Sequence, residues 1–374
     1  MARMSVWIAL LLAIALSGCQ TQTASSRPDI EQSDSQAQQP NSPAVSKREE
    51  DAMKAYQLVI THSKGNYISF TDSETGKMDK LEVGSFPFGL VLYGDERAYV
   101  STAEGVAVVD TKQRKRIALV PYQSNIDKVT SGEYRPGGMG IAVSPDGRYV
   151  YVGVYLPGKE SQLEIMDTSK LAFSGSVPVG TRPFDVAVSR DGSEVYSIDH
   201  DSYSVTIVDP LQGSAKRIKV APFGAGGFEK PHYAVVRDDG KLLLPYQGRG
   251  LAVLDPVRGT YETKPLTGNT HQEGVALSED GSKMFIVGNG AAGSASGDPN
   301  LTVLDVQTMH EEIIPLAKTH QMVAGSPDGR LAYLTGGVTF ADSGWNGVTV
   351  VDLTTKATKE MNLPDYPLDI AILD

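Results

Sequence analysis

Ile141-Ala-Val-Ser-Pro-Asp-Gly147 is a short apolar run that ends in a turn, and close variants of it recur along the chain. The variants are Val186-Ala-Val-Ser-Arg-Asp-Gly192, Ala234-Val-Val-Arg-Asp-Asp-Gly240, Val275-Ala-Leu-Ser-Glu-Asp-Gly281 and Val323-Ala-Gly-Ser-Pro-Asp-Gly329. The apolar residues predict a buried inner strand. The Asp-Gly pair predicts a tight turn into the next strand, because glycine readily adopts φ > 0. Repeats of ~40–50 residues that contain short strands and turns are typical of propeller blades.

A second motif, an apolar run that ends in Asp, occurs seven times. These residues are Asp72, Asp110, Asp167, Asp209, Asp255, Asp305 and Asp352, at intervals of 38 to 57 residues. One such residue per blade predicts an all-β protein, a seven-bladed β-propeller. We expect each carboxylate to accept hydrogen bonds from the amides of the turn that follows it. With one Asp per turn, the carboxylates lie too far apart to share a calcium ion or a catalytic role.

The two ends of the repeat region complement each other. Pro367–Leu373 has the pattern of an inner strand with no later strands, whereas Tyr56–Thr61, Tyr67–Asp72 and Met78–Val83 have the pattern of later strands with no inner strand. We therefore expect the C-terminal strand to close the ring on the N-terminal blade, which leaves no free sheet edge. The predicted propeller domain spans residues 55–374.

The N-terminal segment has the features of an export signal. Arg3 precedes the apolar stretch Val6–Leu16, which is too short to span a bilayer. Leu16-Ser17-Gly18-Cys19 then resembles a bacterial lipobox. This resemblance implies a signal peptide over residues 1–18 and a lipid, with its fatty acids, on Cys19. Residues 19–54 are rich in Gln, Ser, Pro and charge, which predicts a lipidated, disordered tether. The expected location is a membrane surface outside the cytoplasm, facing the periplasm or on the cell surface.

Composition excludes several classes of site and partner. Cys19 is the only cysteine, so the chain has no internal disulfide, cysteine-based zinc or iron–sulfur site, or covalently attached haem. The net charge is −11, and no basic stripe with interleaved aromatic residues occurs, so we expect no nucleic-acid partner. The remaining partners are the membrane lipid, a protein, and a small anionic ligand.

The long insertions all fall on one face of the predicted propeller, which we call the loop face. They are residues 121–138, 155–161, 220–231, 288–300 and 335–347, whereas the opposite face receives only tight turns. Five of the six histidines also map to the loop face. Elaborated loops on one face of a repeat scaffold indicate the binding face.

Three of these histidines occupy the entrances of inner strands in consecutive blades, around the central funnel. They are His232, His271 and His320. In one interpretation each histidine is a polar cap at a strand end. In the other they converge on a metal, a haem-type group or an anionic ligand, since imidazoles suit zinc, copper and iron. The sequence assigns no cofactor and leaves any metal unknown.

Charged residues at the same entrances extend this candidate funnel site. Glu273 would add a carboxylate, and Lys230 and Arg182 would attract carboxylates or phosphates. The candidate ligand-binding residues are therefore His232, His271, His320, Glu273, Lys230 and Arg182.

Several strands resemble those of a known family. Tyr149-Val-Tyr-Val-Gly-Val154, Tyr99-Val-Ser-Thr102, Phe285-Ile-Val-Gly-Asn289 and Tyr333-Leu-Thr-Gly336 resemble the Tyr-Val-Thr-Asn repeats of bacterial surface and periplasmic seven-bladed propellers. The resemblance covers residues 56–374 and implies the fold. The superfamily includes binding proteins, lactonases, quinoprotein amine dehydrogenase subunits and cytochrome d1-type haem domains, so the resemblance leaves function open.

Two shorter resemblances concern the blade entrances. Lys230-Pro231-His232 resembles the Pro-Arg-His entrance of 6-phosphogluconolactonase-type propellers, although the charge comes one residue early. His271-Gln-Glu-Gly-Val-Ala276 resembles entrances in propellers that bind or help to build haem d1. No Ser-His-Asp order, phosphate-binding Gly loop or His-Glu-x-x-His helix occurs. We favour a non-catalytic binding or scaffold module that uses the loop face and funnel. The alternative is an enzyme or chaperone that acts on a lactone or a haem d1-like tetrapyrrole.

Overall fold

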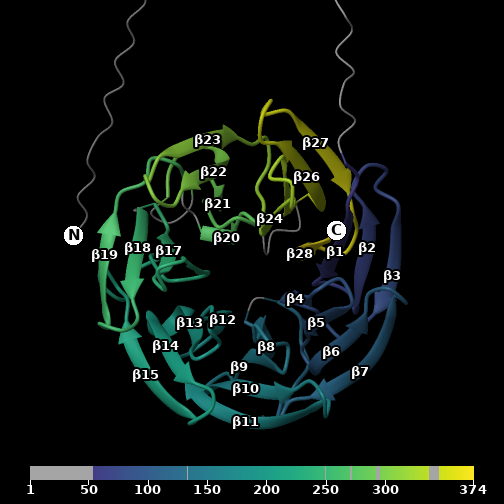
Figure 1. Ribbon diagram of the computed structural model, residues 1–374, viewed down its shortest axis with the longest axis vertical. Helices are drawn as coiled ribbons and strands as arrows, with labels where there is room; N and C mark the ends of the chain where they lie inside the picture. The colour runs from purple at the N-terminus through teal and green to yellow at the C-terminus, as the bar shows by residue number, and fades with distance from the viewer. Residues whose placement is uncertain (1–53, 133, 249, 270–271, 292–294, 337–344) are drawn as a thin grey trace, which may run out of the picture. The chain divides into compact units, whose positions relative to one another are not determined.

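Seven antiparallel sheets of four strands each are arranged in a ring (Figure 1). The computed structural model describes residues 54–374 apart from 133, 249, 270–271, 292–294 and 337–344. The described part of the chain is all-β except for one 3₁₀ turn, η1 (His200–Ser202). It confirms the predicted seven-bladed β-propeller. Within the same residues, no helix has the length and apolarity to cross a membrane. The expected signal peptide, Cys19 and nearly all of the expected tether lie outside the described residues.

The strands of each blade run in order from the centre of the ring outwards. Blade 1 contains β28 (Pro367–Leu373), β1 (Gln57–His62), β2 (Tyr67–Asp72) and β3 (Met78–Glu82), and blade 2 contains β4 (Leu90–Tyr93), β5 (Arg97–Ser101), β6 (Gly105–Asp110) and β7 (Lys115–Pro121). Blade 3 contains β8 (Gly137–Val143), β9 (Tyr149–Tyr155), β10 (Ser161–Asp167) and β11 (Ala172–Val179), and blade 4 contains β12 (Pro183–Val188), β13 (Val195–Asp199), β14 (Ser204–Asp209) and β15 (Ser214–Lys219).

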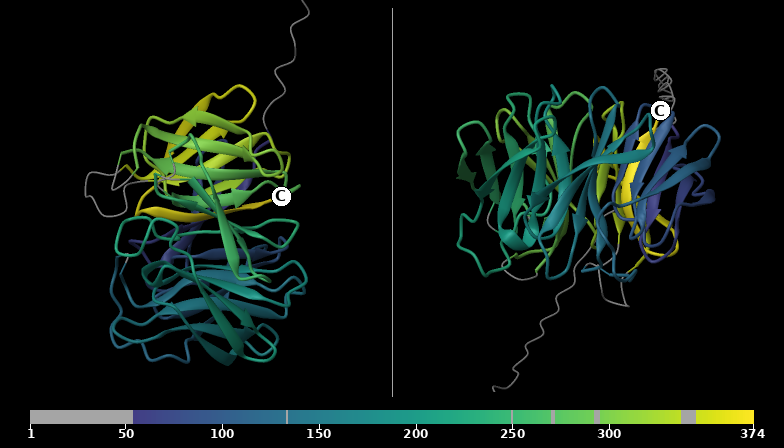
Figure 2. Two further views of the ribbon diagram at one scale, coloured as in Figure 1. Left: turned by 90° about the vertical axis from the view of Figure 1, so that its left-hand side faces the viewer. Right: turned by 90° about the horizontal axis from the view of Figure 1, so that it is seen from below.

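The remaining blades follow the same order. Blade 5 contains β16 (Val235–Val236), β17 (Leu242–Tyr246), β18 (Gly250–Asp255) and β19 (Thr260–Lys264), and blade 6 contains β20 (Gln272–Leu277), β21 (Lys283–Asn289), β22 (Pro299–Asp305) and β23 (Glu311–Pro315). Blade 7 contains β24 (Val323–Gly325), β25 (Leu331–Gly336), β26 (Gly347–Asp352) and β27 (Thr358–Asn362). In side view the strands run between two faces that carry the connecting loops (Figure 2).

The core lies between the blades, because each sheet packs both of its faces against its neighbours. In blade 4 the third strand, β14, is buried along nearly its whole length, whereas the outer strand, β15, is mostly exposed. Ile198 and Val205 of blade 4 share one apolar cluster with Leu242 and Leu244 of blade 5. Burial on both faces explains why the middle strands read as continuous apolar runs.

The C-terminal strand closes the ring, as the sequence predicts. β28 pairs antiparallel with β1, with Ile372 opposite Leu58 and Ile370 opposite Ile60. Beside this seam, the Tyr56 ring packs edge-on against Tyr333 of blade 7, with ring centroids 6.4 Å apart. Blade 1 therefore combines the two ends of the repeat region and leaves no unpaired edge between them.

The recurrent aspartates have the predicted structural role in all seven blades. The carboxylate of Asp72, for example, accepts a hydrogen bond of 2.7 Å from the Thr75 amide. Equivalent amide bonds reach Asp110, Asp167, Asp209, Asp255, Asp305 and Asp352. Hydrogen bonds from the Thr75 side chain and amide hold the pKa of Asp72 below its usual value. Each carboxylate thus stabilises the turn between the third and fourth strands.

Buried hydroxyl groups join neighbouring blades around the axis. Thr61 at the end of β1 donates a hydrogen bond of 3.0 Å to the Phe88 carbonyl in blade 2. Ser101 at the end of β5 donates one of 2.5 Å to the Met139 carbonyl in blade 3, and Thr335 makes the same kind of bond from blade 7 to blade 1. Among the described residues, inner strands of different blades belong to separate sheets, so these contacts help to set their spacing around the axis.

Candidate functional site

Apolar side chains meet on the axis, and we call this cluster the axial plug. Its members are Phe88, Met139, Tyr155, Phe184, Tyr233, Tyr366 and Leu368. They come from five consecutive blades, at or near the points where the inner strands begin on the loop face. Phe184 lines two separate cavities, one toward the loops and one along the axis. The plug therefore stands at the boundary between two candidate sites.

The cavity toward the loops, which we call the mouth pocket, contains three of the predicted site residues. Its volume is about 360 Å³. Its lining consists of Tyr134, Phe184, His200, Gly226, Gly227, Phe228, Lys230, His232, Gln247 and Glu273. Lys230 and His232 precede the inner strand of blade 5, and Glu273 belongs to the inner strand of blade 6, β20. The structure thus brings Lys230, His232 and Glu273 together at one pocket.

A pair of imidazole rings forms part of this pocket. The rings of His200 and His232 lie with their centroids 4.4 Å apart, and His232 stacks on Phe184 at 5.1 Å. His200 comes from η1, between the second and third strands of blade 4. His200 is another of the five histidines that map to the loop face, but the sequence gave no reason to join it to His232. The 3₁₀ turn, which carries His200 toward blade 5, is the feature that sequence patterns do not indicate.

Asp201 links the charged groups behind the pocket. Its Oδ1 accepts hydrogen bonds of 2.8 Å from both His200 Nδ1 and Lys230 Nζ, and its Oδ2 lies 3.4 Å from Arg182 Nη1. Burial alone would raise the pKa of Asp201. The bonds from His200 and Lys230 and the charge of Arg182 outweigh burial and hold this pKa well below its usual value. Burial lowers the pKa of His200 to about 4, so its imidazole is neutral at neutral pH.

Arg182 is fully buried behind the pocket. Its guanidinium lies 3.9 Å from the centre of the Tyr134 ring, and its backbone has a φ of +58° at the entrance of β12. The sequence suggested that Arg182 and Lys230 would attract anions to the funnel. In the structure both cations contact Asp201, so the carboxylate partly neutralises their positive charge in the absence of a ligand. Arg182 acts on the pocket through Asp201 and Tyr134.

His320 is placed differently from His232. It is buried, its Nε2 forms a hydrogen bond of 2.8 Å with the Thr349 hydroxyl, and Trp345 packs edge-on against its ring. It belongs to the lining of neither cavity. These contacts hold the ring against blade 7.

The two described histidines of the predicted set differ by one residue in their position relative to the repeat motif. His232 lies two residues before Ala234 of its repeat motif, and His320 lies three residues before the equivalent Val323. His271 lies outside the described residues. Within the described ranges, no group of three or more His, Cys, Asp or Glu side chains is placed to hold a metal ion.

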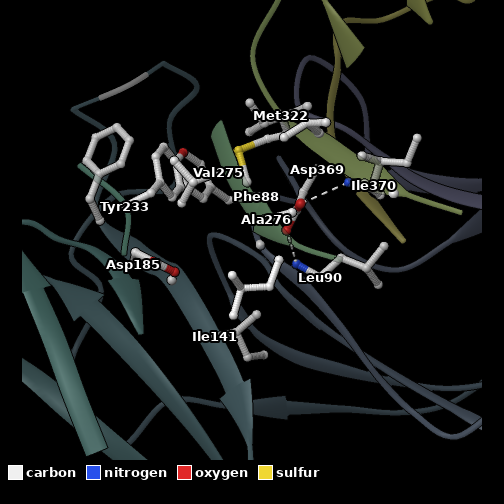
Figure 3. Close-up of a pocket in the computed structure, with 18 residues that line it drawn as sticks. Phe88, Leu90, Ile141, Asp185, Tyr233, Val275, Ala276, Met322, Asp369 and Ile370 are labelled. Carbon is white, nitrogen blue, oxygen red and sulfur yellow. Dashed lines mark hydrogen bonds between the residues drawn. The ribbon is translucent and has the colours of Figure 1, made fainter. Parts of the chain in front are cut away.

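The second cavity, which we call the axial cavity, runs along the centre of the propeller (Figure 3). Its volume is about 310 Å³, and residues of all seven blades line it, most of them from the inner strands. Leu90, Ile141 and Met322 are among the apolar side chains of the lining. Asp185 and Asp369 are the charged residues of this lining, and Figure 3 shows them on two sides of the cavity.

Asp185 and Asp369 occupy the same position in two repeats and make the same contacts. The carboxylate of Asp369 accepts a 2.7 Å bond from the Leu90 amide of blade 2, and that of Asp185 accepts a 3.0 Å bond from the Ala234 amide of blade 5. Each also accepts the amide of the residue that follows it. Burial raises the pKa of Asp185 to about 6 and that of Asp369 to about 7.

Sequence reasoning did not select these two acids. The available signal was their position, because Gly89, Gly140 and Gly274 stand at the equivalent place in three other repeats. An acidic side chain there is unusual for an inner strand, whose side chains face the axis or a neighbouring blade.

Comparison with known proteins identifies the fold alone. No model of a known protein family matches the chain, and no curated protein matches it. Among solved structures, hydrazine synthase of Kuenenia stuttgartiensis aligns with a TM-score of 0.62 and 19% identity, covering 79% of this chain and 92% of that one. A functionally unknown protein from Desulfotomaculum acetoxidans aligns with a TM-score of 0.65 and 12% identity, covering 85% and 99%.

A third solved structure is a periplasmic gluconolactonase of Pseudomonas aeruginosa. It aligns with a TM-score of 0.62 and 16% identity, covering 86% of this chain and 99% of that one. Identities this low establish a shared seven-bladed propeller and leave function to be argued from the site.

Proposed function

We propose that this protein is an exported lipoprotein, anchored through Cys19, whose propeller binds a small ligand in the mouth pocket. One observation carries the binding role: His200, His232, Lys230 and Glu273 reach the same pocket on the loop face. A concave site with aromatic walls and a few converging polar groups is the usual form of a small-molecule site. Tyr134 and Phe228 supply exposed aromatic walls here, being 61% and 68% exposed.

The dimensions and charge of the pocket narrow the ligand. Small-molecule pockets span ~300–1,000 Å³, and the mouth pocket, at about 360 Å³, lies near the lower limit. This size favours a compact ligand such as a lactone over a planar tetrapyrrole. Lys230 and Glu273 place opposite charges in the lining, which suits a polar ligand better than a highly charged anion.

Replacing His232 by Ala is expected to weaken ligand binding at least about tenfold, a loss of ~1.4 kcal/mol of binding free energy. The change removes a ring that stacks on Phe184 and lines the pocket. Calorimetric titration with sugar lactones, small carboxylates and haem would measure it. His310→Ala is the matched control, because His310 is exposed and lies on the opposite face. Equal affinities in the two variants would exclude the mouth pocket as the ligand site.

A second candidate function is the hydrolysis of a small lactone. The observation that favours it is the 2.8 Å bond from His200 Nδ1 to Asp201, which leaves Nε2 as the proton-accepting atom of a neutral imidazole. The same titrations would reveal turnover as release of the ring-opened acid. Turnover that is lost in His200→Gln would establish the enzyme, whereas binding without turnover would support the binding module.

The lipid anchor is tested separately. The cell is expected to incorporate a labelled fatty acid into the full-length protein and to lose all of this label in Cys19→Ala, because Cys19 is the only thiol. The variant should leave the membrane fraction. Labelling that persists in Cys19→Ala, or an unlabelled soluble native protein, would contradict the anchor and leave the pocket proposal intact.

A further inference from the structure

We propose that the axial cavity is a second ligand site that takes a short aliphatic diamine as its diammonium ion, with Asp185 and Asp369 as the anionic partners. The site is distinct from the mouth pocket, because the two described linings have Phe184 in common and otherwise consist of different residues. It is formed by inner-strand residues together with residues that directly precede the inner strands, such as Phe88 and Tyr233.

The charge of the cavity lining favours a cationic ligand. Asp185 comes from blade 4 and Asp369 from blade 1, so the two carboxyl groups approach the cavity from separate sides (Figure 3). No Lys, Arg or His belongs to the described lining of this cavity. A cationic ligand would therefore supply the charge that the lining lacks. Two separated anionic groups match a ligand with an ammonium group at each end.

The remaining lining selects an organic cation over a metal ion. Calcium needs about 6–8 oxygen ligands, and no group of three acidic or histidine side chains in the described part of the chain is placed to hold a metal. Several side chains between the carboxyl groups are apolar, with Leu90, Ile141 and Met322 among them. These side chains would pack against the alkyl chain of an organic cation.

The hydrogen bonds to both acids hold the carboxylates in place. Each accepts two backbone amides, which fixes its orientation and leaves other lone pairs for an ammonium group. The bonds to Leu90 and Ala234 also tie each carboxylate to the next blade. A ligand would thus meet preformed acceptors, and little ordering would be needed on binding.

Binding should depend on pH in a defined direction. Burial raises the pKa values of Asp185 and Asp369 to about 6 and about 7, so both acids are largely protonated at pH 5 and ionised at pH 8. The other titratable groups nearby are Tyr233, whose pKa burial raises well above its usual value, and Glu273 and Tyr366, which interact with Tyr233. A diammonium ion favours the ionised acids, so its binding should release protons between these pH values.

Calorimetric titration of the full mature protein with putrescine tests the proposal. We expect saturable binding at pH 8, affinity at least about tenfold weaker at pH 5, and proton release, measured near pH 6.5 in buffers of different ionisation enthalpy. The Asp185→Asn and Asp369→Asn variants should each lose most of the affinity. Asp298→Asn is the matched control, because it removes the same charge from an exposed loop residue.

Several results would overturn the proposal. The first is that the wild type shows no saturable binding of putrescine at pH 8. The second is an affinity for putrescine that does not change with pH. The third is full affinity in a folded Asp369→Asn variant. Loss of binding in Glu273→Gln but not in Asp369→Asn would place the diamine in the mouth pocket. Because the pH dependence and proton release are measured on the wild type, the test holds even if a variant fails to fold.

Discussion

Deleting Pro367–Asp374 is expected to abolish cooperative folding of the propeller. The deletion removes β28, which provides the inner strand of blade 1 and pairs with β1 over five residue pairs. It also removes Leu368 of the axial plug and Ile370 of the core between blades 1 and 7. The exposed edge of β1 would then be free to pair with other chains.

The size of the effect follows from burial. Burying one large apolar side chain contributes about 1.5–3 kcal/mol, and a typical domain is stable by only about 5–15 kcal/mol. Leu368 and Ile370 are 5% and 6% exposed, so their loss alone consumes much of that margin before the lost sheet hydrogen bonds are counted. Thermal melting and size-exclusion chromatography should show a broad or missing transition and aggregation.

The matched control is removal of Asp374 alone. Asp374 forms an ion pair with Lys54 in which both side chains are 57% exposed, and exposed pairs contribute about 0–1 kcal/mol. This shorter deletion should melt close to the parent protein. If the longer deletion melted like the parent as well, ring closure by β28 would not be what stabilises the fold.

The sequence predicts the architecture well because each blade repeats the same short strand and turn motifs. Asp72 and its six equivalents mark a turn whose amides lie two or three residues away, and such short-range geometry is visible in the chain itself. Closure by Pro367–Leu373 was also predictable, because the N-terminal blade lacked an inner strand and the C-terminal segment had the pattern of one. These features depend on local spacing and on counting strands, and both are properties of the linear sequence.

The candidate site was predictable only in part because its groups come from different blades. Lys230, His232 and Glu273 were expected at the funnel and do line the mouth pocket. His320 shares their approximate repeat position, but its ring turns toward Thr349. His200 and Asp201 depend on the path of one 3₁₀ turn. Side-chain direction and loop path are set by tertiary packing, which a repeat alignment does not contain.

Asp201→Asn is expected to destabilise the protein more than any other single substitution at the mouth pocket. The change removes the anion that partners Arg182, whose side chain is fully buried, and weakens the acceptor for His200 and Lys230. Breaking one partner of a buried ion pair costs about 3–5 kcal/mol. The Asp201 side chain is 23% exposed, so the decrease in unfolding free energy should be at or somewhat below the lower end of that range. Asp238→Asn is the control, because the Arg190–Asp238 pair is well exposed and should matter little.

The pH dependence of the destabilisation by Asp201→Asn shows whether Asp201 stabilises the fold through its charge or through its packing. The pKa of Asp201 in the folded protein lies well below the ordinary value of 3.8, so the unfolded chain takes up its proton first as pH falls. The stabilisation by this carboxylate is therefore fully present above about pH 5 and is lost progressively below pH 4. Denaturant unfolding of wild type and Asp201→Asn should give a difference in unfolding free energy that is constant from pH 8 to 5 and shrinks at lower pH. A difference that stayed constant down to pH 3 would show that Asp201 acts through packing, and the mouth pocket would then lack the charged anchor that positions His200 and Lys230.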